Sequence, residues 1–481
     1  MSLMKKGGRA RWHVFGIYIL AGAICLAFSV PVFSHSIVLD EAYSIVFARE
    51  SPAGIVRATA ADVHPPLYYF LLWFVRVLFG ESIVKYRIIT ALAAYINLFW
   101  LGATLIRRHW GNGVAVFYLL WFGLTYCTFE KSMIIRMYPL GCLLVTAVVI
   151  YLFSLYESWQ KKDYILSIVL TLAAMYTHYF AVMAVFAAWL ILLGAVCLKK
   201  RQRVKQVLCG GLLIALGYLP WMGVVLSQTR KVTEGYWIPR FGWSNWFKAP
   251  ALLMESSLTG CGYALYVLVF ALLFIAWLRR NRDALVTAMV FAGTMLIGAV
   301  LSVCVAPIWE ERYLYVAWGV LALAMALVLG QRCSAFSRIP QGAAVLLLCI
   351  VGVFSFRTMY QGGLNTDTAR EWTGFLESHV EVGDLVIADD DREHILVYQA
   401  YLPDNQVVLL HEVAEMEAAE AEALFAGAAG RPVWYAVNYV MQVEGVPVME
   451  AVCEQYGLDM QSEGRFTIQS KDIEVFRIQG R

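Results

Sequence analysis

Long apolar runs alternate with short polar segments over about the first three quarters of the chain. About 20 apolar residues in helical conformation cross a bilayer core, so we interpret each long run as a membrane-spanning helix. The pattern predicts eleven spans, at about residues 14–34, 84–106, 112–129, 137–156, 164–178, 179–198, 206–226, 258–278, 284–306, 313–330 and 341–357. The chain is therefore predicted to be a polytopic α-helical membrane protein.

Basic residues fall at every second boundary between these spans. The main clusters are Lys5-Lys6, Arg107-Arg108, Lys161-Lys162, Lys199-Lys200-Arg201 and Arg279-Arg280. Because cytoplasmic loops are enriched in Lys and Arg, this spacing predicts a cytoplasmic-membrane protein with its N-terminus inside and its C-terminus outside. The alternation holds only if the long run over 164–198 is split at Tyr176-Thr177-His178-Tyr179.

One apolar run, Leu67 to Phe79, is too short for a span and would invert the orientation of the following loops. We expect it to form an interfacial or re-entrant helix on the outer face, started by Pro65-Pro66, because proline is tolerated in a first helical turn. The first outer loop then covers about residues 35–83.

The composition changes after Phe356, where acidic residues become frequent and strand-like segments alternate with helix-like ones. The order favours a small α/β domain over residues 358–481, following a membrane module over residues 1–357. The expected strands are Leu385–Ala388, Gln406–Leu410, Val433–Val437, Phe466–Gln469 and Glu474–Ile478, and the expected helices are Thr368–Ser378, Glu393–Tyr401, Val413–Ala426 and Pro447–Tyr456.

Composition narrows the function classes. The chain is 60% hydrophobic and 15% charged, with a mean hydropathy of +0.64, which excludes an ordinary soluble protein. A net charge of +3 gives no basic excess of the kind that nucleic-acid binding needs. The C-terminal domain contains no GxGxxG or GxxxxGK[ST] motif that would predict nucleotide binding.

The acidic pair Asp40-Glu41 follows the first span after an apolar approach. A carboxylate held near the membrane surface is partly desolvated, which favours a role as a general base. Alternatively, Asp40 caps the helix that begins there, since Asp is a preferred N-cap residue.

A second acid lies in the same loop, in the run Asp62-Val63-His64-Pro65-Pro66-Leu67-Tyr68-Tyr69. Asp62 and His64 could orient an acceptor, bind a phosphate or contribute to a metal site, although two ligands are too few to define one. Capping of the following helix would explain Asp62 and the prolines but would leave His64 unexplained.

Cations at the outer ends of spans form a third group. They are Lys85, Arg87, Lys131, Arg136, Arg240, Lys248 and Arg312. An anionic lipid headgroup at the outer surface of the membrane needs cations beside it. The planar guanidinium of Arg can donate two hydrogen bonds to phosphate oxygens. The alternatives are snorkelling and local ion pairs, such as Glu130 with Lys131. His178 lies at an outer turn, where it could bind substrate or be structural.

At these residues the sequence resembles the polytopic GT-C glycosyltransferases, in particular glycosyltransferase family 39 with the protein O-mannosyltransferases and the related aminoarabinose transferase acting on lipid A. The resemblance covers roughly the first 330 residues. The matching segments are Asp40-Glu41, Asp62 to Tyr69, Arg87, Arg136-Met137-Tyr138, Tyr176 to Phe180 and Arg312-Tyr313-Leu314.

The resemblance implies inverting transfer of a sugar from a polyprenyl-phosphate donor to an extracytoplasmic acceptor. By position in the motifs, the catalytic candidates are Asp40, Glu41, Asp62 and His64, the donor-phosphate candidates are Arg87, Lys131, Arg136 and Arg312, and the substrate-binding candidates are Tyr68, Tyr138, His178 and Tyr313. Some GT-C enzymes use a divalent cation, Mg²⁺ or Mn²⁺, for which Asp40 and Asp62 are the candidate ligands. No other cofactor is expected.

The alternative function is a transporter or flippase of lipid-linked glycans, which would also need many spans and outer cations. Transporters place ionisable residues and broken helices at the middle of the membrane, often in repeated halves. The spans predicted here are nearly free of charge, and the chain shows no internal repeat.

Overall fold

The structure is a computed structural model that describes residues 13–27, 37, 39–234, 238–246, 259–330, 338–364, 369–388, 394–427, 431–438, 445–468 and 471–480. The chain divides into two compact units. The first comprises Met1–Phe33 and Glu50–Tyr360, and the second comprises Ser34–Arg49 and Gln361–Arg481. Each unit is described by itself.

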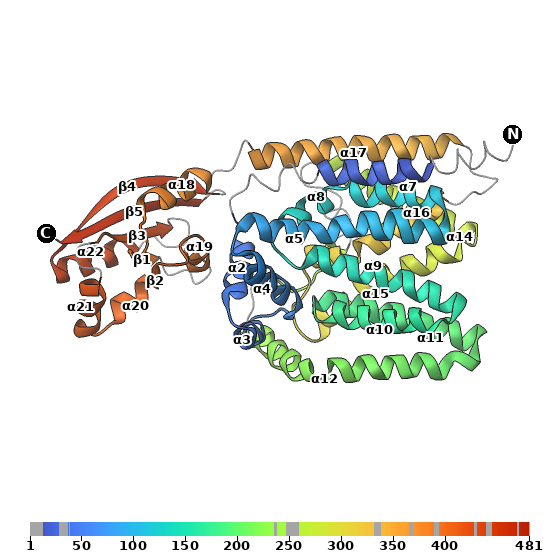
Figure 1. Cartoon of the computed structure of the whole chain (residues 1–481), viewed down its shortest axis with the longest axis horizontal. Helices are drawn as coiled ribbons and strands as arrows, with labels where there is room; N and C mark the ends of the chain where they lie inside the picture. Colours follow the sequence, from blue (N-terminus) through green and yellow to red (C-terminus); the bar gives the residue numbers. More distant parts are fainter. Residues whose placement is uncertain are drawn as a thin grey trace. The chain divides into compact units, whose positions relative to one another are not determined.

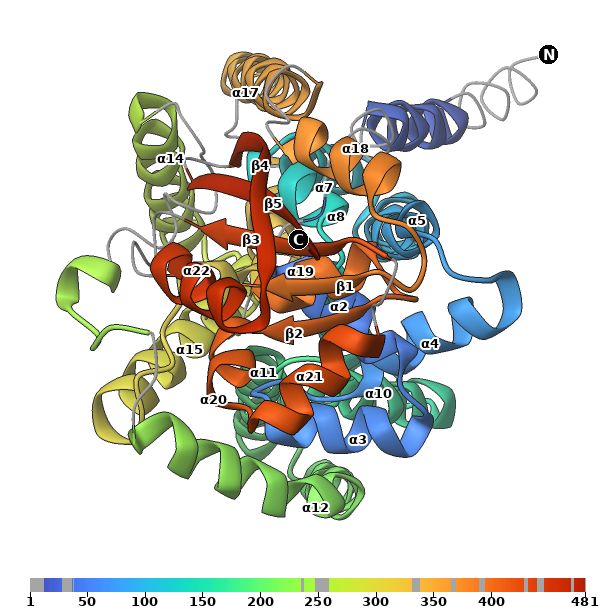
Figure 2. The same cartoon turned by 90° about the vertical axis from the view of Figure 1, so that its left-hand side faces the viewer.

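The first unit is helical, and its long helices share one direction, running lengthwise in Figure 1 and end-on in Figure 2. After a helix at His13–Ala27, its elements are α3 (Pro52–Ala61), α4 (Leu67–Phe79), α5 (Ile83–Ile96), η1 (Asn97–Ile106), α6 (Arg107–Trp110), α7 (Asn112–Gly123), α8 (Tyr126–Met133), α9 (Tyr138–Ser158), α10 (Lys161–Met175), α11 (Tyr179–Lys199), η2 (Arg201–Arg203), α12 (Val204–Glu234), α14 (Thr259–Leu278), α15 (Arg282–Cys304), η3 (Glu311–Ala317), α16 (Trp318–Gly330) and α17 (Arg338–Leu364).

Seven of the described helices are long and apolar enough to cross a membrane, or eight if the bent pair α7–α8 forms one span. The protein is thus an integral membrane protein, as the apolar pattern predicts. The predicted division of residues 164–198 agrees with the structure, because α10 ends at Met175 and α11 begins at Tyr179. The remaining predicted spans coincide with shorter helices, including α10 and His13–Ala27.

The span predicted at residues 112–129 is not one continuous helix, because α7 and α8 meet at an angle of 63°. The hydroxyl of Thr125 donates to the carbonyls of Trp121 and Phe122 at 3.2 and 3.3 Å. These bonds satisfy carbonyl groups at the end of α7 that a continuous helix would satisfy with its own amides. The side chain therefore stabilises the break between the two helices.

Helix α16 lies at the centre of the first unit, where its span is 94% buried. Glycine permits the close packing of this helix against α7. A Cβ atom on Gly330 would lie 2.3 Å from the backbone nitrogen of Val114, closer than real Cβ atoms approach. By contrast, α12 is only 28% buried and exposes Leu212, Leu216 and Leu219, as expected for a helix that faces lipid.

Two short helices, α3 and α4, precede the long helices. The Ser51 hydroxyl caps α3 by accepting from the Gly54 amide at 3.1 Å. Helix α4 has the bounds that the apolar run predicts, and its first amide, that of Leu67, donates to the Tyr176 carbonyl at 3.0 Å. This bond ties the start of α4 to the turn between α10 and α11.

The second unit is a mixed α/β fold. Its helices are α2 (Leu39–Arg49), α18 (Ala369–His379), α19 (His394–Tyr401), α20 (Leu410–Glu415), α21 (Ala418–Gly427) and α22 (Gly445–Tyr456), and its strands are β1 (Leu385–Ala388), β2 (Gln406–Leu409), β3 (Val433–Asn438), β4 (Leu458–Ile468) and β5 (Lys471–Gly480). The sheet order is β2-β1-β3-β5-β4, with parallel pairs β1–β2 and β1–β3 and antiparallel pairs β3–β5 and β4–β5.

Helices pack on both faces of this sheet. On one face Ile387 and Tyr435 share a core with Met449 of α22. On the other face the Trp434 ring meets the Phe375 ring of α18, with centroids 5.8 Å apart. The structure differs from the sequence prediction in three details: β4 begins at Leu458 rather than Phe466, β5 begins at Lys471 rather than Glu474, and the helix expected over 413–426 is broken into α20 and α21.

Candidate active site

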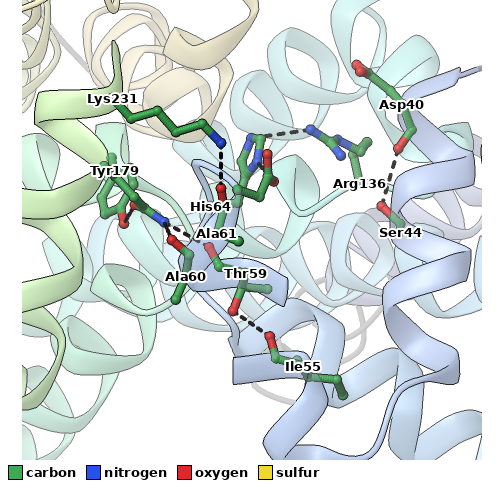
Figure 3. A network of polar contacts seen from close by, with 12 residues as sticks. Asp40, Ser44, Ile55, Thr59, Ala60, Ala61, His64, Arg136, Tyr179 and Lys231 are labelled. Atoms are coloured by element: carbon green, nitrogen blue, oxygen red, sulfur yellow. Dashed lines mark hydrogen bonds and ion pairs between the residues drawn. The ribbon is translucent and has the colours of Figure 1, made fainter. Parts of the chain in front are cut away.

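The end of α3 is held by long side chains from α12. The Gln228 amide donates to the carbonyls of Thr59 and Ala60 at 2.8 and 3.2 Å, and the Lys231 ammonium donates to the Ala61 carbonyl at 2.8 Å. These carbonyls belong to the last turn of α3, where a helix has no partner for them. Figure 3 shows Lys231 reaching Ala61, next to Ala60 and Thr59. Residue 62 follows directly and is thereby fixed in position.

Asp62 is the C-cap residue of α3 and does not cap α4, whose N-cap is Pro66. The capping role considered for Asp62 is therefore wrong. Its Oδ2 atom lies 2.8 Å from Nδ1 of His64, and the other ring nitrogen, Nε2, lies 3.2 Å from Nη2 of Arg136. Figure 3 shows Arg136 meeting the imidazole of His64.

The protonation of His64 follows from these contacts. A guanidinium can only donate hydrogen bonds, so Nε2 of His64 must accept from Arg136. Nδ1 then carries the proton and donates it to the Asp62 carboxylate. The imidazole is neutral in this arrangement, and both of its nitrogens are engaged. Asp62, His64 and Arg136 form a chain of polar contacts that orients the guanidinium.

The neighbours of Asp62 also determine its charge state. Burial by itself would raise the pKa of the Asp62 carboxyl. The contact with His64, including its hydrogen bond, and the positive charge of Arg136 outweigh burial and lower the pKa below its usual value. Asp62 is therefore an ionised hydrogen-bond acceptor at neutral pH.

His178 lies on the other side of His64, with ring centroids 6.3 Å apart. It is the N-cap of α11, and its Nδ1 accepts from the Phe180 amide at 3.1 Å. Burial lowers the pKa of His178 well below its usual value, and the neighbouring His64, Arg136 and Arg312 lower it further. The ring is thus neutral, with its proton on Nε2, and it offers a hydrogen-bond donor.

Two tyrosines surround His178. Its ring centroid lies 5.6 Å from that of Tyr138 and 5.1 Å from that of Tyr313. The hydroxyl of Tyr138 is buried and has no hydrogen-bond partner among the residues that the structure describes. Two cations border these rings: Lys131 Nζ lies 5.9 Å from the Tyr138 centroid, and Arg312 Cζ lies 5.7 Å from that of Tyr313.

We name these side chains the His64 cluster. Its members are Asp62, His64, Arg136, Tyr138, His178 and Tyr313, with Lys131 and Arg312 at its border. Both border cations also make the local ion pairs that the sequence suggests, Lys131 with Glu130 at 2.9 Å and Arg312 with Glu310 at 3.7 Å. These eight side chains are all site candidates predicted from the sequence, and they come from four separate segments of the chain.

An apolar cavity of about 330 Å³ opens beside the His64 cluster. Its polar wall contains His64, His178 and Tyr313, and its apolar walls come from α11, α12 and the segment that follows α15. The apolar lining includes Met183, Met222, Val225, Val232, Leu301 and Ile308. The cavity therefore joins an apolar volume to neutral hydrogen-bonding groups, with cations close behind them.

The remaining candidates lie elsewhere. Tyr68 on α4 is buried, and its hydroxyl lies 2.6 Å from that of Thr90 on α5. Arg87 is buried on α5, one turn before Thr90. Asp40 and Glu41 belong to the second unit, in the first turn of α2.

Helix α2 begins at Leu39, so Asp40 is a residue of the helix and not its N-cap. The Ser44 hydroxyl donates to the Asp40 carbonyl at 3.4 Å, as Figure 3 also shows. Glu41 is 2% exposed, whereas Asp40 is half-buried. Of the two acids, Asp40 is the more accessible.

The metal ligands that the resemblance suggests do not form a complete set. Within the described part of the chain, no three His, Cys, Asp or Glu side chains converge so as to hold a metal ion. Asp62 already contacts His64 through Oδ2.

Sequence reasoning missed the residues that hold the site in place. Gln228 and Lys231 are polar positions at the end of a predicted span, which by themselves predict only a boundary. Tyr179 also donates to the Gln228 amide oxygen and accepts from Trp221 Nε1 at 3.1 Å. The sequence offers one signal for this role. Gln228 lies near the end of an apolar helix, where a buried polar side chain needs a hydrogen-bond partner.

Comparisons with known proteins show which family model and which solved structures the chain resembles. Residues 63–223 match a family described as dolichyl-phosphate-mannose-protein mannosyltransferase. ArnT from Cupriavidus metallidurans in the apo state superposes with a TM-score of 0.65 at 12% identity, covering 96% of this chain and 98% of that one. The chain shares the GT-C fold. ArnT bound to undecaprenyl phosphate gives a TM-score of 0.63 at 11% identity, with the same coverage.

A second GT-C protein shows the same fold over part of its length. The arabinofuranosyltransferase AftD from Mycobacteria superposes with a TM-score of 0.54 at 14% identity, covering 98% of this chain and 40% of that one. No curated protein matches the chain in sequence. At these identities the shared fold says nothing about the substrate.

Proposed function

We propose that this protein is an inverting glycosyltransferase that moves a sugar from a polyprenyl-phosphate donor to an extracytoplasmic acceptor. The observation that carries the proposal is the apolar cavity that ends at the His64 cluster, with Arg136, Lys131 and Arg312 beside it. An amphiphilic donor needs both features, an apolar volume for prenyl units and cations for the phosphate. The structure of ArnT bound to undecaprenyl phosphate, a protein of the same fold, supports this class of donor.

In this proposal His64 is a positioning residue. Its two nitrogens are engaged by Asp62 and Arg136, which leaves neither free to accept a proton from substrate. Asp62 and His64 instead hold the Arg136 guanidinium in one orientation. A fixed cation costs no reorganisation when negative charge develops on the leaving phosphate.

The reaction is a single displacement at the anomeric carbon. The acceptor oxygen or nitrogen forms a bond to this carbon as the bond to the phosphate oxygen breaks, so the configuration inverts. The proton of the acceptor passes to the carboxylate of Asp40, the accessible acid of α2. The electron pair leaves with polyprenyl phosphate, whose charge Arg136, Arg312 and Lys131 stabilise.

The neutral Nε2–H of His178 and the buried hydroxyl of Tyr138 supply further hydrogen bonds. Both groups lie at the polar wall, where the headgroup of the donor would be placed. We place this end of the bundle outside the membrane, with the N-terminus inside, from the distribution of Lys and Arg. Nucleotide sugars are absent there, so a lipid must deliver the sugar.

Transfer of radiolabelled sugar from isolated polyprenyl-phosphate donors tests the proposal. The purified full chain in nanodiscs is compared with Asp40→Asn, and with Glu50→Gln as a control in an exposed acid just beyond α2. We expect the wild type and Glu50→Gln to transfer sugar, and Asp40→Asn to be slower by roughly 10²–10⁴-fold, the contribution of a positioned base.

The outcomes separate the two function classes. Transfer that is lost in Asp40→Asn, while the binding of labelled donor persists, supports an enzyme with Asp40 as its base. Equal transfer by both proteins removes Asp40 from the mechanism. Donor binding without transfer to any acceptor, together with movement of donor across vesicle membranes, would overturn the enzyme in favour of a lipid-glycan transporter.

A further inference from the structure

Helix α2 carries the proposed base, yet it groups with the C-terminal domain and not with the helical bundle. It packs against α19, a helix more than 340 residues away in sequence. The membrane module and the soluble domain predicted from sequence are thus not separated at residue 357, because residues 34–49 belong to the same compact unit as residues 361–481.

Contacts at both ends of α2 hold it against α19. The Arg49 guanidinium, at the last position of α2, donates from Nη1 to the Gln399 carbonyl and from Nη2 to the Ala400 carbonyl, the latter at 2.8 Å. Just before α2, the Ile37 amide donates to the Tyr401 hydroxyl at 2.8 Å.

These contacts satisfy groups that a helix leaves without partners. Gln399 and Ala400 are in the last turn of α19, where carbonyls lack intrahelical donors and the helix dipole favours a cation. The Tyr401 ring is itself fixed by Trp372 of α18, with centroids 5.8 Å apart. Trp372 is 2% exposed and also packs against Tyr398. The position of α2 is thereby linked to the interior of the domain.

We propose that the C-terminal domain positions the base, and that Arg49 is the positioning residue that fastens α2 to it. The proposal rests on the proposed function for the identity of the base. Only Glu50 separates Arg49 from Ser51, the N-cap of α3, so the fastened segment joins the bundle through a very short connection. Release of α2 from α19 would free the Asp40 carboxylate from its fixed position in the second unit, whereas the proposed donor-binding side chains of the His64 cluster all belong to the first unit.

Two measurements on the full chain in nanodiscs test the proposal. Hydrogen–deuterium exchange over residues 39–49 reports the fastening, and the kcat and KM of sugar transfer report its effect on catalysis. The variants are Arg49→Met, which removes both hydrogen bonds, and Arg49→Lys, which keeps a donor. Arg431→Met is the matched control, because Arg431 also donates to a backbone carbonyl of the domain, that of Val382 at 2.9 Å.

For Arg49→Met we expect exchange over residues 39–49 to be about tenfold faster, and kcat to be about tenfold lower with the donor KM unchanged. Arg49→Lys should recover part of both effects, and Arg431→Met should show neither. Unchanged exchange in Arg49→Met overturns the proposal. So does faster exchange with an unchanged kcat, or an equal increase in exchange over β1 and β3, which would indicate general loosening of the domain.

Failure of the proposed function gives a different result. If the wild type transfers no sugar, the identity of the base is wrong, while the exchange measurement still decides whether Arg49 fastens α2. If the wild type is active and Asp40→Asn is equally active, Asp40 is not the base, and a loss of kcat in Arg49→Met would then have to be assigned to another residue.

Discussion

Nη2 of Arg136 lies 3.2 Å from Nε2 of His64, and because the guanidinium can only donate, the imidazole must accept. This contact joins the segment after α3 to the segment between α8 and α9, which are more than 70 residues apart in sequence. Together with the contact between Nδ1 and Asp62, it engages both nitrogens of His64, so in the proposed function the imidazole positions the guanidinium of Arg136.

Replacement of Arg136 by lysine tests whether the oriented guanidinium contributes to sugar transfer. Lysine keeps the charge but loses the planar pair of donors, so it cannot contact His64 and a phosphate with the same geometry. We expect kcat/KM for sugar transfer to fall by about 10–100-fold, which corresponds to the loss of a hydrogen bond between charged groups. Arg107→Lys is the control, because the guanidinium of Arg107 donates to the Ala103 carbonyl of the same helical segment, at 2.8 Å. Equal effects of the two variants would contradict the prediction.

The neutral state of His178 predicts a pH dependence of stability. Its pKa in the folded protein is well below the ordinary value of 6.5, so below pH 6.5 the unfolded chain binds a proton that the folded protein does not. Stability therefore falls as the pH falls through this range, by at most about 1.4 kcal/mol per pH unit for one proton. The thermal midpoint of the wild type should decrease between pH 7.5 and 5.5 more steeply than that of His178→Asn. Parallel curves would show that His178 does not titrate in this way.

Gln228 and its contacts predict a stability effect localised to α3. Gln228→Leu keeps the size of the side chain but leaves the carbonyls of Thr59 and Ala60 without their donor. We expect a loss of about 1–3 kcal/mol, the cost of unsatisfied buried groups, measured as a lower thermal midpoint and faster exchange over residues 52–61. Thr229→Val, which removes only a bond to the Val225 carbonyl of the same helix, should have a smaller effect.

Local sequence patterns predicted the elements that depend on local physics. The bounds of α4 and β1 agree with the prediction, because apolar runs and turn residues mark both ends. The bend at Thr125 was missed, since a threonine inside an apolar run predicts a continuous helix as well as a broken one. The exposed first half of β4 lacks the apolar alternation that identifies a strand.

The candidate site was predictable in its residues but not in its connections. Asp62, His64, Arg136 and His178 were identified because polar groups at the ends of apolar spans need an explanation. Their pairing depends on how distant helices pack, and no local pattern encodes it. The attachment of α2 to α19 by Arg49 is of the same kind, as it joins residues 350 positions apart.

The close approach of α7 and α16 predicts a strong effect of a single methyl group. A Cβ on Gly330 would lie 2.3 Å from the Val114 backbone nitrogen, and backbone atoms cannot turn aside as a side chain can. Gly330→Ala should destabilise the protein by about 1–3 kcal/mol, the usual cost of overpacking. Gly194→Ala is the control, because no atom lies within 4 Å of the added Cβ on α11. A thermal midpoint in Gly330→Ala as high as that of the control would contradict the packing described here.

The apolar cavity predicts a selective effect on donor binding. Ala306 lines the cavity, so Ala306→Phe places a ring where prenyl units of the donor are proposed to lie. Contacts with these units are equal in the ground state and the transition state, so their loss should raise the KM for a long-chain donor by about tenfold and leave kcat nearly unchanged. Val303→Phe places the same ring on a residue of α15 that is 67% exposed, and it should leave both constants unchanged. A donor shortened to one or two prenyl units should be less sensitive to Ala306→Phe, because it fills less of the cavity. An unaltered KM for the long-chain donor would show that the chain lies outside this cavity.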